Sequence, residues 1–313
     1  MVCMAEKIRK LKGGNDLFVS EDEKFLVNYN SRNSVYVYDL AATDTKPLFS
    51  ARTVSNVGEV CISPDKKLIA AKNTSGEMAV ISLETGEELL RNKMKQSEGY
   101  RIVFTDDGRY VLDFDWNGTT MLLDWKSNEF KVLDGPNIRG ENGKPYIAYM
   151  GYDRYSKQIY KFVEGEKGFN KCRGVAKSSK LKSGKVKYKV IHEFNGHVPD
   201  FHSSISFCKE HNYYCDLQTG EIVKCDKDFN EIERRPYPSY YDGQNKRLIK
   251  CWVSPLEKYA LMDSYQGPLI LCDMVTGKVL RDFDYLYVCG FTMINEDKTF
   301  IIPTWEGTYI GNL

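Results

Sequence analysis

Residues 251–281 of this chain repeat the pattern of residues 60–90 without a gap. Serine, proline, lysine and glycine recur at matching places in the two stretches. The aligned pairs are Ser63 with Ser254, Pro64 with Pro255, Lys67 with Lys258, Gly76 with Gly267, and Gly86 with Gly277. Such a repeat indicates small structural units that cannot bury a core alone and must pack against their neighbours.

Each unit combines short apolar runs with turns of recurring composition. A first run ends in a turn of the form Ser-x-Asp-x-Lys, a second in a Gly or Asn turn, and a third in a turn resembling Asp-Leu-x-Thr-Gly. The runs are rich in Val, Ile, Tyr and Phe and last about 5–8 residues, which is too short for helices. In the turns, Asp caps its own backbone and Gly supplies positive φ. The chain is therefore predicted to be all-β.

Seven units follow one another at spacings of about 40–45 residues, the period of a four-stranded β-propeller blade. Five are clear, and two between the third and the sixth are weaker. The clear units are residues 19–40, a unit beginning at Val60, residues 103–128, a unit beginning at Cys251, and residues 293–313. Of the two weaker units, one contains residues 149–165 and the other ends in residues 212–220. This count assigns Gly220 to the same turn as Gly86 and Gly277, which leaves a long interval of 57 residues before Gly277.

The two ends of the chain indicate how the propeller closes. The last unit stops at Leu313, inside its third strand, and residues 6–13 precede the first unit without belonging to one. An N-terminal strand that completes the last blade would pair both exposed edges. We therefore expect one domain over residues 1–313, a seven-bladed β-propeller whose ring is closed by that strand.

Several turns carry a family resemblance. The third-strand turns read YDLAATD, ISLETGE, CDLQTGE and CDMVTGK, and the first-strand turns include SPDKK, TDDGR and NEDKT. With these turns, nearly the whole chain resembles the WD-repeat and related bacterial-type seven-bladed propellers. The resemblance implies a fold; the role that it suggests, a scaffold for protein–protein interaction, follows by analogy alone.

Composition narrows the classes of partner. The formal net charge is +1, so no global field attracts nucleic acid or a membrane surface. No apolar run is long enough to span a bilayer, and the N-terminus lacks the apolar stretch of a signal peptide. The nine cysteines are scattered, without paired spacing. We expect a cytoplasmic monomer that binds neither nucleic acid nor membrane.

Chemical motifs are sparse. His202, Cys208, His211 and Cys215 offer zinc's preferred ligands, but their spacing matches no closed structural site, so we expect no metal. The sequence lacks a nucleophile elbow, a phosphate loop and a dinucleotide fingerprint, and no cofactor is expected. Acids near the ends of second strands could contribute to a site at the central channel, although a structural role is the simpler interpretation. These acids are Asp113, Asp115 and Asp263.

Two segments are predicted to lie on the surface of the protein, and one of them is a candidate for binding. Residues 171–189 hold eight basic residues and no acid, which predicts a solvated hairpin on blade four. Residues 226–248 look like an insertion, and residues 231–246 are predicted to connect two blades. This insertion is rich in Arg and Tyr, the types enriched at binding hot spots. Its candidates are Arg234, Arg235, Tyr237, Tyr240 and Tyr241.

Three aromatic residues occupy one position of their units, two residues before an aligned glycine. They are Trp116, Tyr265 and Trp305. This position ends the second strand, on the face where blade-to-blade connections open, so we expect a shared binding surface with the insertion.

The leading hypothesis is a non-catalytic cytoplasmic module that binds a protein or peptide on one propeller face. Two alternatives stay open: an enzyme, either a lyase or a hydrolase, with its site at the mouth of the central channel, and a small-molecule sensor that uses the channel as its pocket.

Overall fold

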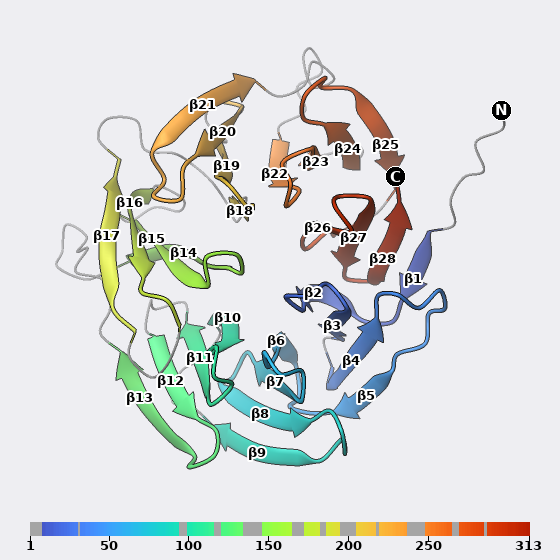
Figure 1. The fold of residues 1–313 in the computed structure, drawn as a ribbon, viewed down its shortest axis with the longest axis vertical. Coiled ribbons are helices and arrows are strands. Elements are labelled where there is room, and N and C mark those ends of the chain that lie inside the picture. Colours follow the sequence, from blue (N-terminus) through green and yellow to red (C-terminus); the bar gives the residue numbers. More distant parts are fainter. Residues whose placement is uncertain are drawn as a thin grey trace. The chain divides into compact units, whose positions relative to one another are not determined.

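Figure 1 shows the computed structural model of the protein. It describes residues 8–30, 32–93, 99–115, 120–133, 146–164, 172–181, 186–194, 205–216, 219–236, 248–264, 269–284 and 287–313. Within these ranges all regular structure is β-strand, and they contain no helix that could span a membrane. The all-β prediction is confirmed.

The described strands form seven antiparallel four-stranded sheets. This is a seven-bladed β-propeller, as the repeat predicts. Six sheets take four strands consecutive in sequence, and the last takes its fourth strand from the N-terminus. Repeats 60–90 and 251–281 lie within the second and sixth sheets, whose strands are bounded alike.

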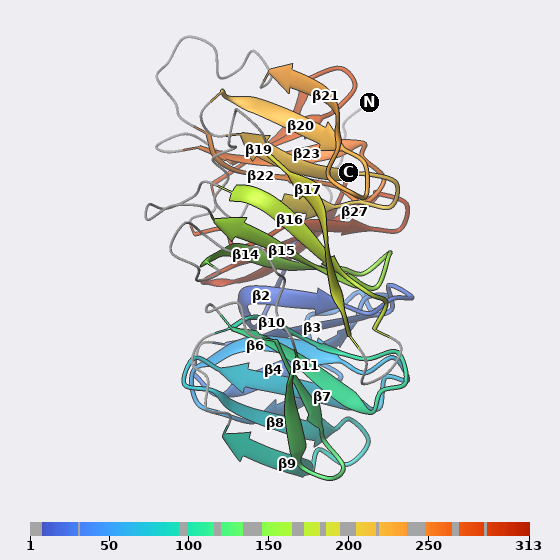
Figure 2. The same cartoon turned by 90° about the vertical axis from the view of Figure 1, so that its left-hand side faces the viewer.

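One of the two compact units comprises residues 1–113, 122–131 and 286–313. It holds the first, second and last sheets and part of the third. The first sheet consists of β2 (Gly14–Val19), β3 (Phe25–Tyr29), β4 (Ser34–Asp39) and β5 (Phe49–Arg52). The second consists of β6 (Val57–Ile62), β7 (Leu68–Asn73), β8 (Glu77–Ser82) and β9 (Glu88–Lys93). The last consists of β1 (Arg9–Leu11), β26 (Thr292–Ile294), β27 (Thr299–Thr304) and β28 (Gly307–Asn312). Figure 2 shows β6 to β9 side by side in order. The first strands β2 and β6 contact each other, and apolar side chains of the first and second sheets form a shared core.

The second unit comprises residues 114–121 and 132–285. It holds the fourth, fifth and sixth sheets. The fourth sheet consists of β14 (Tyr146–Asp153), β15 (Gln158–Glu164), β16 (Cys172–Ser178) and β17 (Tyr188–Glu193). The fifth consists of β18 (Ile205–Phe207), β19 (Asn212–Asp216), β20 (Glu221–Cys225) and β21 (Glu231–Pro236). The sixth consists of β22 (Leu248–Val253), β23 (Tyr259–Ser264), β24 (Leu269–Asp273) and β25 (Val279–Phe283). Apolar cores lie between the fourth and fifth sheets and between the fifth and sixth. The third sheet has strands that contribute to both units: β10 (Gly99–Phe104), β11 (Tyr110–Asp115), β12 (Thr120–Asp124) and β13 (Glu129–Leu133).

The recurring serine turn explains why the repeat folds as hairpins. The Ser63 hydroxyl accepts the Leu68 amide at 3.0 Å, and the Ser254 hydroxyl accepts the Tyr259 amide at the same distance. The fourth turn residue adopts positive φ in both, 61° at Lys66 and 64° at Glu257. The serine therefore satisfies an amide at the start of the second strand and fixes the hairpin.

The N-terminal segment completes the last sheet. In β1, Arg9, Lys10 and Leu11 pair with β28 in an antiparallel register. Leu11 is buried in the core that the first and last sheets share. The prediction that residues 6–13 supply the missing strand is confirmed for the part that the structure describes.

One register assignment is wrong. Gly220 lies between β19 and β20, the second and third strands of the fifth sheet, whereas Gly86 and Gly277 lie between third and fourth strands. All three amides nevertheless make the same turn bond, to Ser82, Asp216 and Asp273. Because this turn is local, either hairpin of a blade can use it. Gly220 matches Gly267 instead, 47 residues away, so the interval is ordinary.

Candidate functional sites

Trp305 and Tyr287 form an exposed aromatic pair. Their ring centroids lie 4.6 Å apart with only 9° between the ring planes, and the side chains are 66% and 63% exposed. Trp305 follows the second strand of the last sheet, β27, and Tyr287 lies in the connection from β25 to β26. At this contact the end of a second strand meets a connection between two blades.

The backbone beside Tyr287 is fixed in an unusual conformation. Tyr287 has φ of 57°, which is uncommon for a bulky residue. The next two residues tie the connection to β27: Val288 bridges Thr304, and the Cys289 amide donates to Pro303 at 3.0 Å. Strain that the surroundings hold in place is a pointer to function.

The other predicted aromatic residues cannot be placed. Strands β11 and β23 end directly before Trp116 and Tyr265, which agrees with the predicted position, but both residues lie outside the described ranges. Tyr237, Tyr240 and Tyr241 also lie outside them.

The predicted Arg- and Tyr-rich connection begins later than expected. Residues 231–236 form β21, the outer strand of the fifth sheet, so their assignment to a connection is wrong. The Gly220 misassignment caused this error, because it left the fourth strand unaccounted for.

The two arginines of β21 are held by acids. Arg234 contacts Asp216, Glu221 and Glu231, with nitrogen–oxygen distances of 3.3, 3.2 and 2.8 Å. The Glu231 hydrogen bond is the main cause that raises the pKa of Arg234. Arg235 pairs with Glu233 at 2.6 Å and donates to the Met274 carbonyl at 3.1 Å.

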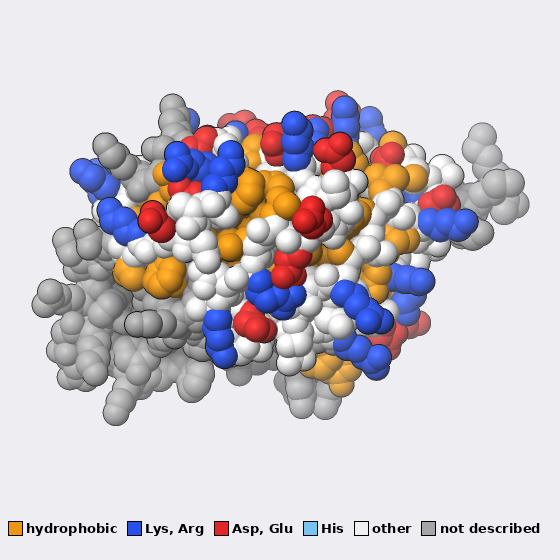
Figure 3. Space-filling model, turned by 90° about the horizontal axis from the view of Figure 1, so that it is seen from below, with side chains coloured by type: hydrophobic (Ala, Val, Ile, Leu, Met, Phe, Trp, Pro, Cys, Tyr) orange, Lys and Arg blue, Asp and Glu red, His pale blue; other side chains and the backbone are white. Residues whose placement is uncertain are grey.

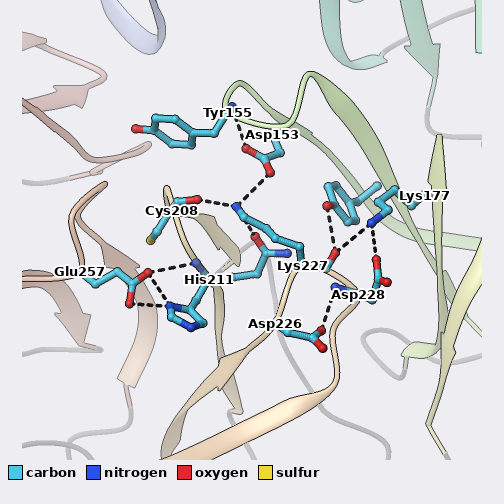
Figure 4. Close-up of polar contacts among 11 residues, drawn as sticks. Asp153, Tyr155, Lys177, Cys208, His211, Asp226, Lys227, Asp228 and Glu257 are labelled. Atoms are coloured by element: carbon cyan, nitrogen blue, oxygen red, sulfur yellow. Dashed lines mark hydrogen bonds and ion pairs between the residues drawn. The ribbon is translucent and has the colours of Figure 1, made fainter. Parts of the chain in front are cut away.

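The candidate zinc ligands have other partners. His211 Nδ1 lies 2.9 Å from Glu257, as Figure 4 shows. The Cys208 thiol donates to the Val253 carbonyl, and Cys215 is buried in the core. His202 lies outside the described residues. Within the described ranges, no three His, Cys, Asp or Glu side chains group as a metal site would require.

Lys227 is the hub of a polar network between the fourth and fifth sheets (Figure 4). Its ammonium donates to Asp153 Oδ2 at 3.1 Å, to the Cys208 carbonyl and to Asn212 at 3.3 Å. Asp153 is fully buried and ends β14. This geometry neutralises a buried carboxylate and cross-links two blades, which is a structural role.

Glu257 joins the fifth sheet to the sixth. It accepts hydrogen bonds from Tyr213 at 2.7 Å and from His211, and it pairs with Lys224 at 3.2 Å. Burial alone would raise the pKa of Glu257, but these hydrogen bonds outweigh burial and lower it below its usual value. The carboxylate is thus a fixed anchor in the first-to-second strand turn of the sixth sheet.

A charged triad at the first strands of three consecutive sheets was not predicted. Asp16, Glu59 and Arg101 each lie four residues before the Ser or Thr of the first turn, in β2, β6 and β10. The Arg101 guanidinium lies 3.0 Å from Asp16, so a side-chain ion pair links the first strands of the third and first sheets. Register shifts in β2 and β6 lie just before Leu17 and Glu59. Such bulges re-aim side chains and are frequent beside functional sites.

Lys72 and Asp113 add a fully buried ion pair beside this triad. They are 1% and 0% exposed, and Lys72 is the register partner of Glu59. Asp113 therefore has a structural partner. Asp263, another predicted candidate, has its pKa raised by burial, with Lys250 opposing the rise. The side chain of Asp115 lies outside the described set.

Glu59 carries the chemical interest of the triad. The residue is half-buried, but its Oε2 atom is buried and accepts no hydrogen bond from the described residues. Burial raises the pKa of Glu59 well above its usual value, and Arg101 opposes the rise. Lys250 holds the same position in β22, so aligning the repeats shows a charge in four first strands but not which of these charges meet.

The described part of the basic segment belongs to a hairpin on blade four, as predicted, but its strand β16 is not solvated, because Val175 and Ala176 are buried. Strands β16 and β17 pair in the fourth sheet. Lys189 is exposed on β17, the outer strand, and Lys187 is exposed directly before it. Lys177 is bound to Asp228. On the face shown in Figure 3, charged side chains of both signs are interspersed with hydrophobic ones, and neither sign dominates its coloured part.

Comparison with known proteins adds no identification. No protein-family model matches this sequence, and no curated protein matches it either.

Proposed function

We propose that this protein is a non-catalytic interaction module that binds a protein or peptide through the surface around Trp305 and Tyr287. The observation that carries the proposal is the exposed stacked pair itself. Trp and Tyr are enriched at binding hot spots because they bury a large rigid area and keep a polar atom available.

The local structure favours a binding role over a packing role. An isolated exposed ring needs no explanation, but these two rings are ordered against each other while most of their surface faces solvent. The bridge between Val288 and Thr304 holds the connection before any partner arrives. A preorganised surface loses less entropy when it binds.

The proposal includes a relation to WD-repeat-like propellers and a scaffold role in the cytoplasm, with the protein acting as a monomer. The first-strand and third-strand turns support the relation, and the scattered cysteines support a reducing compartment. Cys61, Cys208, Cys215, Cys225, Cys251 and Cys272 are buried, and Cys289 is half-buried.

The test compares Trp305→Ala and Tyr287→Ala with Phe130→Ala, which removes an exposed ring from β13. We expect all three variants to keep the melting temperature within a few degrees, because surface truncations change stability by only about 0.5 kcal/mol. Only the first two should lose the partner recovered from a native lysate of the source organism. Recovery of every partner by both variants would contradict the proposal.

The triad supports a second candidate, a small-molecule site at the first strands. A buried carboxyl oxygen without a hydrogen-bond partner is costly, and functional sites retain such groups. The test is Glu59→Gln, which should raise stability at neutral pH and abolish any ligand-induced rise in melting temperature.

A further inference from the structure

A cavity of about 330 Å³ opens between the fourth and fifth sheets, within the second unit. Its wall on the fourth sheet is formed by the end of β17 and the next residue: His192, Glu193 and Phe194. The wall on the fifth sheet consists of Tyr214, Phe229, Glu231 and Arg234. This volume falls within the lower range of known small-ligand pockets.

Three of the residues that line the cavity carry aromatic rings of Phe or Tyr. Phe194 packs edge-on against Tyr214, with centroids 6.4 Å apart and planes at 86°. Tyr214 and Phe229 belong to the buried core of the two sheets, so their positions are fixed by packing. Burial raises the pKa of Tyr214, so its hydroxyl stays protonated and the ring carries no charge. Neutral ring faces attract cations.

The charges around the cavity are unequal. Arg234 supplies one positive charge, but Asp216, Glu221 and Glu231 surround it with three carboxylates. Glu193 adds a further exposed carboxylate on the opposite wall. A register shift beside Glu231 places it and Arg234 at the same cavity although they are three residues apart. The guanidinium is therefore neutralised, and the described residues around the cavity keep an excess of negative charge.

From this combination we propose that the cavity binds an alkylammonium group, either on a lysine side chain of a polypeptide or on a free amine. The aromatic rings accept the cation and its methylene chain, and the carboxylates of Glu193 and Glu231 accept its hydrogen bonds. An anion would meet these carboxylates and is disfavoured. The site does not depend on the Trp305 surface, so either proposal can fail without the other.

The experiment titrates the full chain with n-butylammonium and, separately, with a tripeptide that has a central lysine. Binding is measured by calorimetry or from changes in amide chemical shifts. Glu193→Gln should weaken both by about fivefold, the value of one carboxylate–ammonium contact near a surface. Glu233→Gln is the matched control, because it removes the same charge from β21 without lining the cavity. A tripeptide with central norleucine should not bind.

The two probes distinguish the source of the amine. Tighter binding of the tripeptide supports a polypeptide partner, and tighter binding of n-butylammonium supports a free amine. The proposal is overturned if neither probe binds saturably, if the norleucine tripeptide binds equally well, or if Glu233→Gln weakens binding as much as Glu193→Gln does.

Discussion

Two glycines at similar places in the first and second sheets differ in whether a side chain could replace them. Gly14 and Gly58 lie near the start of the first strands β2 and β6. A Cβ atom on Gly14 would lie 1.8 Å from the Thr304 carbonyl oxygen, whereas one on Gly58 would meet Thr74 at an ordinary 3.5 Å. Close approach of the first and last sheets thus requires glycine at residue 14, and the second sheet has no such requirement.

Gly14→Ala should therefore destabilise the protein and Gly58→Ala should not. Overpacking of this kind costs about 1–3 kcal/mol or more, because the clash is with backbone and cannot be relieved by a rotamer change. Thermal unfolding followed by circular dichroism measures both variants. Equal melting temperatures for the two would show that the first and last sheets are not packed this closely in solution.

At the scale of the element, local signals were enough to predict the blades but not their register. Ser63 and Ser254 predict hairpins because the hydroxyl bonds its own turn. The Thr219-Gly220 turn fails as a marker of strand order, because the hydrogen bond from the Gly220 amide to Asp216 is equally local and suits either hairpin of a blade. The Tyr287 contact with Trp305 could not be predicted, since it depends on a strained connection whose sequence carries no turn motif.

The N-terminal strand is the element whose loss should matter most. Besides its ladder with β28, the segment offers carbonyls to other strands: Tyr38 donates to Lys12 at 2.8 Å, and Thr308 donates to Gly13 at 3.1 Å. Removing residues 1–13 exposes the edge of β28 and the Leu11 site in the core, which favours aggregation.

We expect this truncated chain to melt well below the full-length protein, or to aggregate on purification, as judged by calorimetry and light scattering. Removing only residues 1–5 is the control and should leave the melting temperature unchanged. An unchanged melting temperature after removal of residues 1–13 would contradict the role of β1 in completing the last sheet.

At the scale of the molecule, the residues that sequence reasoning missed are those whose meaning arises only when several sheets meet. Asp16, Glu59 and Arg101 are unremarkable in their own units, and none has a motif around it. They become a triad because β2, β6 and β10 are neighbours and because Arg101 reaches past the second sheet to Asp16. Burial of charge at this place opposes stability, as we expect if the triad is the small-molecule site proposed above.

That relation gives the last prediction. The folded pKa of Glu59 exceeds the ordinary value of 4.5, so the folded state holds the proton more tightly than the unfolded chain does. The stability of the protein should therefore fall as pH rises from 4.5 through the folded pKa, by about 1.4 kcal/mol for each unit of difference. Glu59→Gln removes this titration. Its gain in melting temperature should be close to zero near about pH 4, where the carboxyl is protonated in both states, and should grow toward about pH 8. Glu84→Gln, at an exposed glutamate in the turn from β8 to β9, is the control and should show no such trend. A loss of stability for Glu59→Gln at neutral pH would mean that the charged form of Glu59 holds the three sheets together, and the triad would then be structural.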